Sequence, residues 1–232
     1  MKHGYVISDL HLFTRRSNAG EYAPAMHDAA AEADFFVLNG DIVDFRWSVH
    51  ADTAATIQAI LDWLEALISP HPHCRFFYVM GNHDGCQPLA DALQRFAETT
   101  SNFDWNDSHL RIGNTLFLHG DLPLENRDGD ICKRRLGEAE NSRHHLQHQI
   151  YSALVALRMH VLATRLGNTR QCARCILDNL RQYEPDLADG LTDVYFGHVH
   201  RTLRDFAYDG VRFHNTGASV RGVDCRVLRV RT

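Results

Sequence analysis

The sequence predicts an α/β fold, and two observations support this. First, segments with the pattern of β-strands alternate along the chain with segments that have the pattern of helices. Second, each main strand is followed by a loop rich in polar turn residues. Most of these loops combine glycine with aspartate, asparagine or histidine, and the first contains an aspartate and a histidine. Alternating strands and helices favour layers in which helices pack against sheets. The 232 residues fit a single domain, 1–232, and the 44% hydrophobic content can supply its core.

The main strands are expected where a short apolar run is bounded by turn residues. These runs cover 4–8, 35–39, 75–80, 115–119 and 193–197. Stretches with helical periodicity lie at 22–33, 52–68 and 87–98. Shorter strands are expected at 109–112, 204–208, 211–215 and 225–230.

Seven potential metal ligands follow the main strands. Side chains two residues apart in an extended segment point the same way, so Asp9 and His11 can reach one ion, and His198 and His200 form a second such pair. Imidazole nitrogens together with carboxylate or amide oxygens suit manganese, iron or zinc, whereas an all-oxygen cage would suit magnesium or calcium. The set is Asp9, His11, Asp41, Asn82, His119, His198 and His200.

Five motifs carry these residues in the order Asp-x-His, Gly-Asp-x-x-Asp, Gly-Asn-His-Asp, His-Gly and Gly-His-x-His. In this order they resemble the calcineurin-like metallophosphoesterase superfamily over residues 9–200. The resemblance implies a four-layer αββα sandwich of two mixed sheets flanked by helices. It also implies a first ion held by Asp9, His11, Asp41 and His200, and a second held by Asp41, Asn82, His119 and His198, with Asp41 shared.

The implied cofactor is a pair of divalent metal ions, for which we expect Mn²⁺, with iron or zinc as alternatives. Two ions roughly 3.5–4 Å apart can generate a hydroxide near neutral pH and stabilise the attacking and leaving oxygens of an in-line displacement. We therefore expect a phosphohydrolase that cleaves a phosphoester or pyrophosphate bond.

Three residues of the motifs are not implied ligands. His83 is expected to contact the phosphoryl oxygen or protonate the leaving oxygen, with Asp84 orienting it, because an imidazole held by a carboxylate is a good proton donor. The alternative is that His83 only braces the ligands. Asp44 can either orient a ligand histidine or cap a helix that begins nearby.

The segment at about 122–189 is longer than a minimal member of the superfamily needs, and we expect it to be a helical insertion, or lid. Apolar residues at helical spacing predict one helix over about 137–166, and a second is expected at Thr169–Tyr183 after the Gly167-Asn168 break. Between Asp130 and Gln182 the sequence contains nine Lys and Arg but only four acidic residues, whereas the whole chain has a net charge of −5.

This basic segment next to an anion-processing centre suggests substrate binding, with a solvated helix surface as the alternative. The candidate phosphate contacts are Arg15, Arg16, Lys133, Arg134 and Arg135.

The size, the motif order and the insertion resemble UDP-2,3-diacylglucosamine hydrolases, although His83 stands where their best-known branch has arginine. This resemblance implies a phosphorylated small-molecule or lipid-linked substrate, such as a nucleotide-sugar or a lipid-linked diphosphate like UDP-2,3-diacylglucosamine itself. Alternatives are a nuclease, a cyclic-nucleotide phosphodiesterase or a non-catalytic interaction module. The acidic net charge argues against nucleic acid as a partner.

The cellular location is expected to be cytoplasmic. The first strand is expected within a few residues of Met1, so we expect no signal peptide, and no apolar run approaches the ~20 residues of a membrane-spanning helix. Peripheral contact with the inner face of the membrane through the insertion is a further hypothesis. The six cysteines are expected to be reduced.

Overall fold

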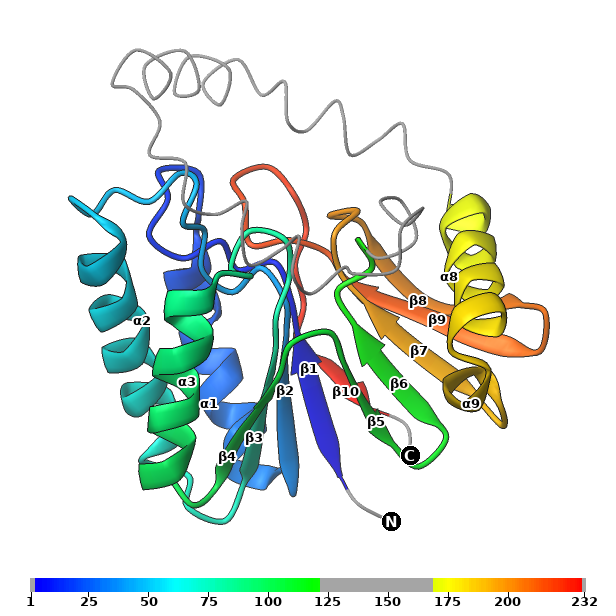
Figure 1. The fold of residues 1–232 in the computed structure, drawn as a ribbon, viewed down its shortest axis with the longest axis horizontal. Coiled ribbons are helices and arrows are strands. Elements are labelled where there is room, and N and C mark those ends of the chain that lie inside the picture. Colours follow the sequence, from blue (N-terminus) through cyan, green and yellow to red (C-terminus); the bar gives the residue numbers. More distant parts are fainter. Residues whose placement is uncertain (1–2, 122–168, 231–232) are drawn as a thin grey trace.

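The computed structural model describes residues 3–121 and 169–230, in which two five-stranded sheets pack face to face with helices on their outer sides (Figure 1). In spatial order, the first sheet contains β10 (Leu228–Val230), β1 (Gly4–Ile7), β2 (Phe35–Asn39), β3 (Arg75–Val79) and β4 (Phe103–Asn106). The second contains β5 (His109–Ile112), β6 (Thr115–Leu118), β7 (Asp193–Phe196), β9 (Val211–Thr216) and β8 (Thr202–Tyr208). The predicted sandwich of two mixed sheets is confirmed.

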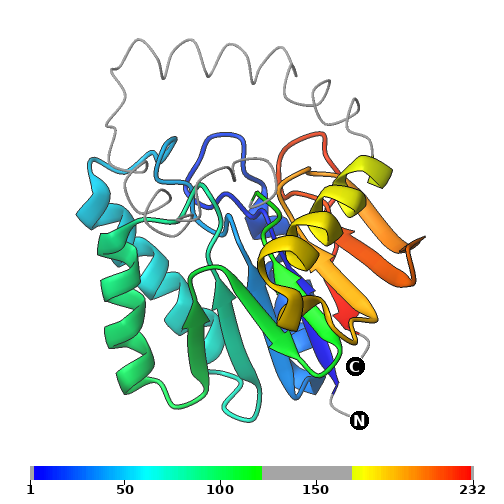
Figure 2. The same ribbon diagram turned by 45° about the vertical axis from the view of Figure 1, so that its right-hand side comes forward.

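Helices cover the outer face of each sheet. The first sheet is covered by α1 (Ala23–Glu32), α2 (Thr53–Ile68) and α3 (Gln87–Thr99), and a short 3₁₀ helix, η1 (Ala19–Tyr22), precedes them. The second sheet is covered by α8 (Thr169–Tyr183), which α9 (Pro185–Ala188) follows (Figure 2). The described residues contain no helix with the length and apolar character needed to cross a bilayer.

Strand β2 shows why the apolar runs of the sequence are continuous rather than alternating. Phe36 and Leu38 pack in the hydrophobic cluster beneath the helices, whereas Phe35 and Val37 pack in the cluster between the two sheets. A strand with both faces buried needs apolar side chains at every position. The aromatic rings of Phe117 and Tyr195 stack in the intersheet layer, with centroids 5.3 Å apart.

Helix α2 illustrates how the helices begin. The side chain of Asp52 accepts a hydrogen bond of 2.8 Å from the backbone N–H of Ala55, which satisfies one of the free donors of the first turn. Ile60 and Leu64, one turn apart, then point to the sheet and are fully buried.

The parallel strand pairs align the loops that carry the candidate ligands. Val6 of β1 pairs with Val37 of β2, which pairs with Phe77 of β3, and Leu118 of β6 pairs with Phe196 of β7. The carboxyl ends of β1, β2 and β3 therefore lie together, as do those of β6 and β7. The distance of 3.1 Å between His119 Nε2, after β6, and Asp41 Oδ2, after β2, places both sets at the same end of the sandwich.

Helix α8 covers the residues predicted for the second helix of the insertion and ends, as predicted, at Tyr183. Its buried side chains pack on the second sheet. The predicted helix over 137–166, and with it Lys133, Arg134 and Arg135, lies outside the described residues. Strand β4 was not predicted from the sequence.

Candidate metal centre

All seven predicted ligands lie together at the carboxyl ends of β1, β2, β3, β6 and β7. Backbone hydrogen bonds of 2.9 Å join the first two loops, from Asp9 N–H to the carbonyl of Gly40 and from His11 N–H to the carbonyl of Asp41. Five of the ligands have left-handed backbone conformations, with φ between 45° and 67°: Asp9, His11, Asp41, His198 and His200. Such conformations are uncommon for residues other than glycine and concentrate at functional sites.

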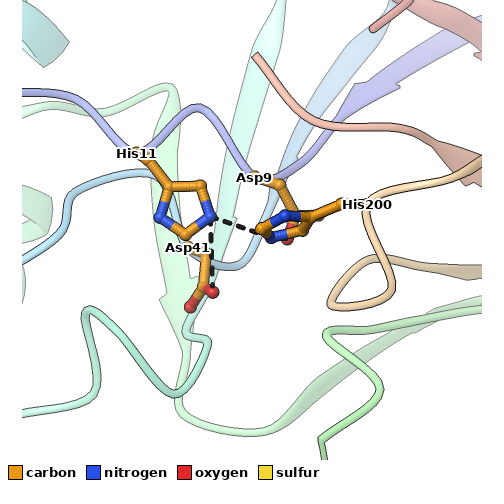
Figure 3. Close-up of side chains that lie close together, drawn as sticks. All are labelled: Asp9, His11, Asp41 and His200. Atoms are coloured by element: carbon orange, nitrogen blue, oxygen red, sulfur yellow. Dashed lines mark hydrogen bonds and ion pairs between the residues drawn. The ribbon is translucent and has the colours of Figure 1, made fainter. Parts of the chain in front are cut away.

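The first cluster contains Asp9, His11, Asp41 and His200, whose potential ligand atoms all lie within 4.8 Å of one another (Figure 3). The Nε2 atoms of His11 and His200 are 3.0 Å apart, and His200 Nε2 lies 3.2 Å from Asp9 Oδ1. The two aspartates and His11 are buried. The four side chains therefore converge on one small volume, as the residues around a single ion do.

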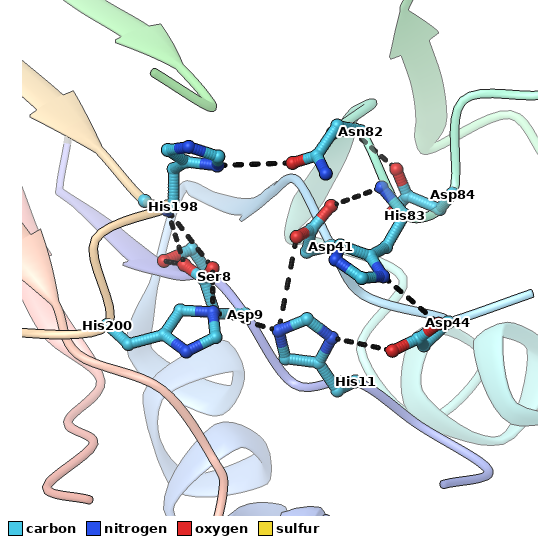
Figure 4. Close-up of polar contacts among 12 residues, drawn as sticks. Ser8, Asp9, His11, Asp41, Asp44, Asn82, His83, Asp84, His198 and His200 are labelled. Carbon is cyan, nitrogen blue, oxygen red and sulfur yellow. Dashed lines mark hydrogen bonds and ion pairs between the residues drawn. The ribbon is translucent and has the colours of Figure 1, made fainter. Parts of the chain in front are cut away.

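The second cluster is organised around the amide oxygen of Asn82 (Figure 4). Asn82 Oδ1 lies 3.1 Å from His119 Nε2 and 3.1 Å from His198 Nδ1. His119 Nε2 is also 3.1 Å from Asp41 Oδ2, the oxygen that lies 3.9 Å from His11 Nε2. Asp41 thus belongs to both clusters, in the position of a bridging ligand.

The electrostatics of the two clusters fit divalent cations. Burial, assisted by the charge of Arg16, lowers the pKa of His11 to about 4, so this imidazole is neutral and has a lone pair to donate. At His119 burial acts in the same direction, but the charges of Asp41 and Asp9 outweigh it and raise the pKa to about 10. The buried carboxylates therefore favour positive charge beside them. A metal ion can supply this charge in place of the proton on His119.

Comparison with protein families supports this interpretation. The family model described as calcineurin-like phosphoesterase matches residues 5–202. This chain belongs to the calcineurin-like phosphoesterase family. It is therefore a hydrolase of phosphoester bonds, and the family and the Asp/His clusters together indicate a dinuclear divalent metal centre.

One solved structure with a similar fold is a dimetal phosphatase from Danio rerio. It is 14% identical in sequence, the match covers 94% of this chain and 88% of that one, and the TM-score is 0.47. A comparison with curated proteins found no match.

In this phosphoesterase, the carboxylate of Asp44 contacts two histidines, the predicted ligand His11 and His83. Its Oδ2 is 3.3 Å from His11 Nδ1, and its Oδ1 is 3.1 Å from His83 Nδ1. It also accepts a hydrogen bond from the backbone N–H of Trp47. Of the two predicted roles, Asp44 therefore orients a ligand histidine; the nearest following helix, α2, has Asp52 as its N-cap.

The prediction that Asp84 orients His83 is wrong. The Oδ2 atom of Asp84 accepts hydrogen bonds from the hydroxyl of Tyr78, at 2.7 Å, and from the backbone N–H of Ile42, at 2.8 Å, while Oδ1 accepts one from Gly81 N–H. Burial and the charge of Asp41 raise the pKa of Asp84 to about 6. Asp84 thus ties the loop after β3 to the loop after β2, whereas Asp44 contacts the His83 ring.

The contact of Arg16 with a substrate phosphate remains a prediction, and the structure shows other partners for this side chain. Arg16 is buried, and its Nη2 atom lies 3.2 Å from Asp44 Oδ2 and 3.1 Å from His11 Nδ1. A charge this far from solvent requires a partner, and Asp44 provides it. Arg15 next to it is exposed.

Two close approaches of the backbone to the ligands require glycine. A Cβ atom at Gly81 would overlap Asp41 Oδ1, and one at Gly197 would overlap Asp9 Oδ2. The role of Ser8 was not predicted: its hydroxyl donates a hydrogen bond of 2.5 Å to Asp9 Oδ2 and lies 2.7 Å from the hydroxyl of Thr216. A serine immediately before the first ligand was the available signal.

Proposed function

We propose that this phosphoesterase is a two-metal hydrolase in which His83 donates a proton to the leaving oxygen. The observation that carries the proposal is the shared position of Asp41 between two ligand clusters, with His83 beside it. When bound, divalent ions at these clusters would supply positive charge to the phosphoryl oxygens and to the attacking water.

His83 has the contacts expected of a proton donor. Its backbone N–H donates a hydrogen bond of 2.8 Å to Asp41 Oδ1, which fixes the residue to the bridging ligand. Its Nδ1 atom faces Asp44, and its Nε2 atom has no hydrogen-bond partner among the described residues, so Nε2 is available to a substrate. Burial lowers the pKa of His83, but Asp44 and Asp41 more than offset this effect and raise it, which favours the protonated form of the ring that a proton donor needs.

The roles of Asp41 and His83 are separable by experiment. In the manganese-loaded protein, Asp41→Asn should reduce metal content and turnover together, whereas His83→Ala should retain metal and lower kcat by a factor on the order of 10²–10⁴. The control is His73→Ala, which removes an exposed histidine whose Nε2 contacts the carbonyl of Ala31. Full activity in either Asp41→Asn or His83→Ala would contradict the proposal.

The leaving group provides a sharper test of His83. Because p-nitrophenolate departs readily without a proton and an alkoxide does not, His83→Ala should slow hydrolysis of an alkyl phosphate ester much more than hydrolysis of a p-nitrophenyl ester. Equal losses on both esters would mean that His83 only positions the phosphoryl group.

For the substrate, we propose a phosphorylated small molecule or a lipid-linked diphosphate of the UDP-2,3-diacylglucosamine type. The resemblance of motif order and insertion supports this class, and so does the basic composition of the insertion. The test is a manganese-loaded panel of p-nitrophenyl phosphate, bis-p-nitrophenyl phosphate, cyclic nucleotides and UDP-2,3-diacylglucosamine, with identification of products. Preferential turnover of a cyclic nucleotide or of the simple diester would support a phosphodiesterase instead.

The basic insertion can be tested within the same panel. Neutralising Lys133, Arg134 and Arg135 together should raise KM for the preferred large substrate more than for p-nitrophenyl phosphate. An equal change for both substrates would remove these three residues from substrate recognition.

A further inference from the structure

A polar cavity lies away from the seven predicted ligands, at the side of the sandwich where β10 and β8, the end strands of the two sheets, face each other. Its volume is about 520 Å³. It is bounded by β1 and β10 of the first sheet and by β8 and β9 of the second. The lining residues are Tyr5, Thr202, Leu203, Arg204, Asn215, Arg226, Val227, Leu228 and Arg229.

The charged side chains that line this cavity are all positive. Three exposed arginines, Arg204, Arg226 and Arg229, line it, and no aspartate or glutamate does. Within the described residues, no carboxylate lies within 4.0 Å of the guanidinium of Arg226 or Arg229, and Arg204 has only Asp205, at 3.8 Å.

Two arginines outside the cavity differ from Arg226 and Arg229 in having a carboxylate partner. Arg212 Nη2 lies 2.6 Å from Asp193, and Arg75 Nη2 lies 3.3 Å from Asp104, so each has a carboxylate partner. In a chain with a net charge of −5, a cavity lined by arginines and by no acidic residue has the charge that favours an anion.

The remaining lining residues indicate what the anion is attached to. Leu203, Val227 and Leu228 contribute apolar surface, and the volume falls in the range of cavities that bind small molecules, roughly 300–1,000 Å³. Guanidinium groups bind phosphate through paired hydrogen bonds. We propose that this cavity binds an organic phosphate, with its phosphate on Arg226 and Arg229 and its apolar portion on Leu203 and Val227.

The cavity is distinct from the metal centre but adjoins the strands that support it. None of the seven ligands lines it, although Thr202 follows His200 by two residues. Asn215 Nδ2 donates a hydrogen bond of 2.8 Å to the carbonyl of Gly197, next to His198. A ligand in the cavity would therefore rest against the backbone that positions the last two metal ligands.

The binding site can be located by arginine modification. The full-length, manganese-loaded protein is treated with phenylglyoxal, and modified arginines are identified by mass spectrometry with and without phenylphosphonate, an organic phosphonate whose carbon–phosphorus bond resists hydrolysis. We expect protection of Arg204, Arg226 and Arg229, and no protection of Arg75. Inorganic phosphate, which has no apolar portion, should protect only at higher concentration.

Variants then test which residues hold the probe. In R226Q/R229Q, the concentration of phenylphosphonate that protects Arg204 should rise at least about tenfold, because two charge-assisted contacts are lost. The matched control is R75Q, which removes an exposed arginine of β3 and should leave protection unchanged. Far-UV circular dichroism confirms that both variants are folded.

Two results would overturn the proposal. One is the absence of protection at Arg226 and Arg229 up to about 10 mM phenylphosphonate. At that concentration, even weak binding with a Kd of about 1 mM, a binding free energy of about −4.1 kcal/mol, would be detected. The other is equal protection by inorganic phosphate, which would show that the apolar surface contributes nothing. The readout is binding, so neither result depends on whether the proposed hydrolysis occurs.

Discussion

Replacement of Asp44 by asparagine is the most informative single change that the structure suggests, because one carboxylate serves three groups. Asp44 is fully buried and lies within 3.3 Å of Arg16, His11 and His83. The nearby histidines hold its pKa well below the usual range despite burial, so it is ionised at every working pH. Asp44→Asn keeps the shape of the side chain and removes the charge.

The expected loss of stability follows from the burial of the Arg16–Asp44 pair. The Arg16 side chain is 10% exposed and that of Asp44 is 0% exposed. Removing one partner of a buried pair costs about 3–5 kcal/mol because the remaining charge stays buried without compensation. This loss is a large part of the total free energy of unfolding of a typical protein, about 5–15 kcal/mol. It can be measured by urea unfolding of the metal-depleted protein.

The same substitution should change the pH profile. Since Asp44 raises the pKa of His83, its neutralisation should lower that pKa, and the alkaline limb of kcat/KM should move to lower pH. The matched control is Asp104→Asn in the exposed pair with Arg75, which should cost no more than about 1 kcal/mol. Unchanged stability together with an unchanged alkaline limb in Asp44→Asn would refute the assignment of Asp44.

Two further substitutions test other buried carboxylates. Asp84→Asn should lower the free energy of unfolding by about 1–3 kcal/mol, because the new amide group would face the N–H of Gly81 or Ile42. The alkaline limb of the kcat/KM profile should not move. A shifted limb would mean that Asp84 is a partner of His83 after all. Asp193 is bound by Arg212 and His214, and these bonds lower its pKa although burial raises it. Its stabilisation is therefore complete above the unfolded pKa of about 3.9 and is lost as pH falls through the lower folded pKa. Asp193→Asn should lower the free energy of unfolding by about 1–3 kcal/mol at pH 7. Measured by urea unfolding, the difference in this free energy between the variant and the native protein should become smaller below about pH 4. A difference that does not depend on pH would contradict this prediction.

The strands that carry the ligands could be predicted from the sequence because both of their faces are buried. In β2 all five residues are buried, so the apolar run marks the strand directly. Strand β4 escaped prediction because it lies at the edge of its sheet, where only Phe103 is buried and the polar Asp104 and Asn106 interrupt the run. Its pairing with β3 is a tertiary contact that local pattern does not encode.

The ligands were predictable for the same reason: each follows a recognisable strand. The supporting residues were not, since their partners come from other loops. Asp84 is adjacent to His83 in sequence, but Asp44, from the loop after β2, reaches its ring. Arg16 was predicted to contact a substrate phosphate, and only the fold reveals the buried carboxylate of Asp44 with which it pairs.

The left-handed backbone at five of the ligands has a consequence for how this protein responds to selection. Each such residue costs roughly 1–3 kcal/mol relative to a relaxed conformation, and glycine or asparagine would adopt the same angles more readily. A substitution at Asp9, His11, Asp41, His198 or His200 that relieved this strain would at the same time remove a predicted ligand, and at Asp9 or Asp41 it would also remove a buried charge partner of His119. A thermostabilisation campaign on this enzyme must hold those positions constant and seek its improvements elsewhere.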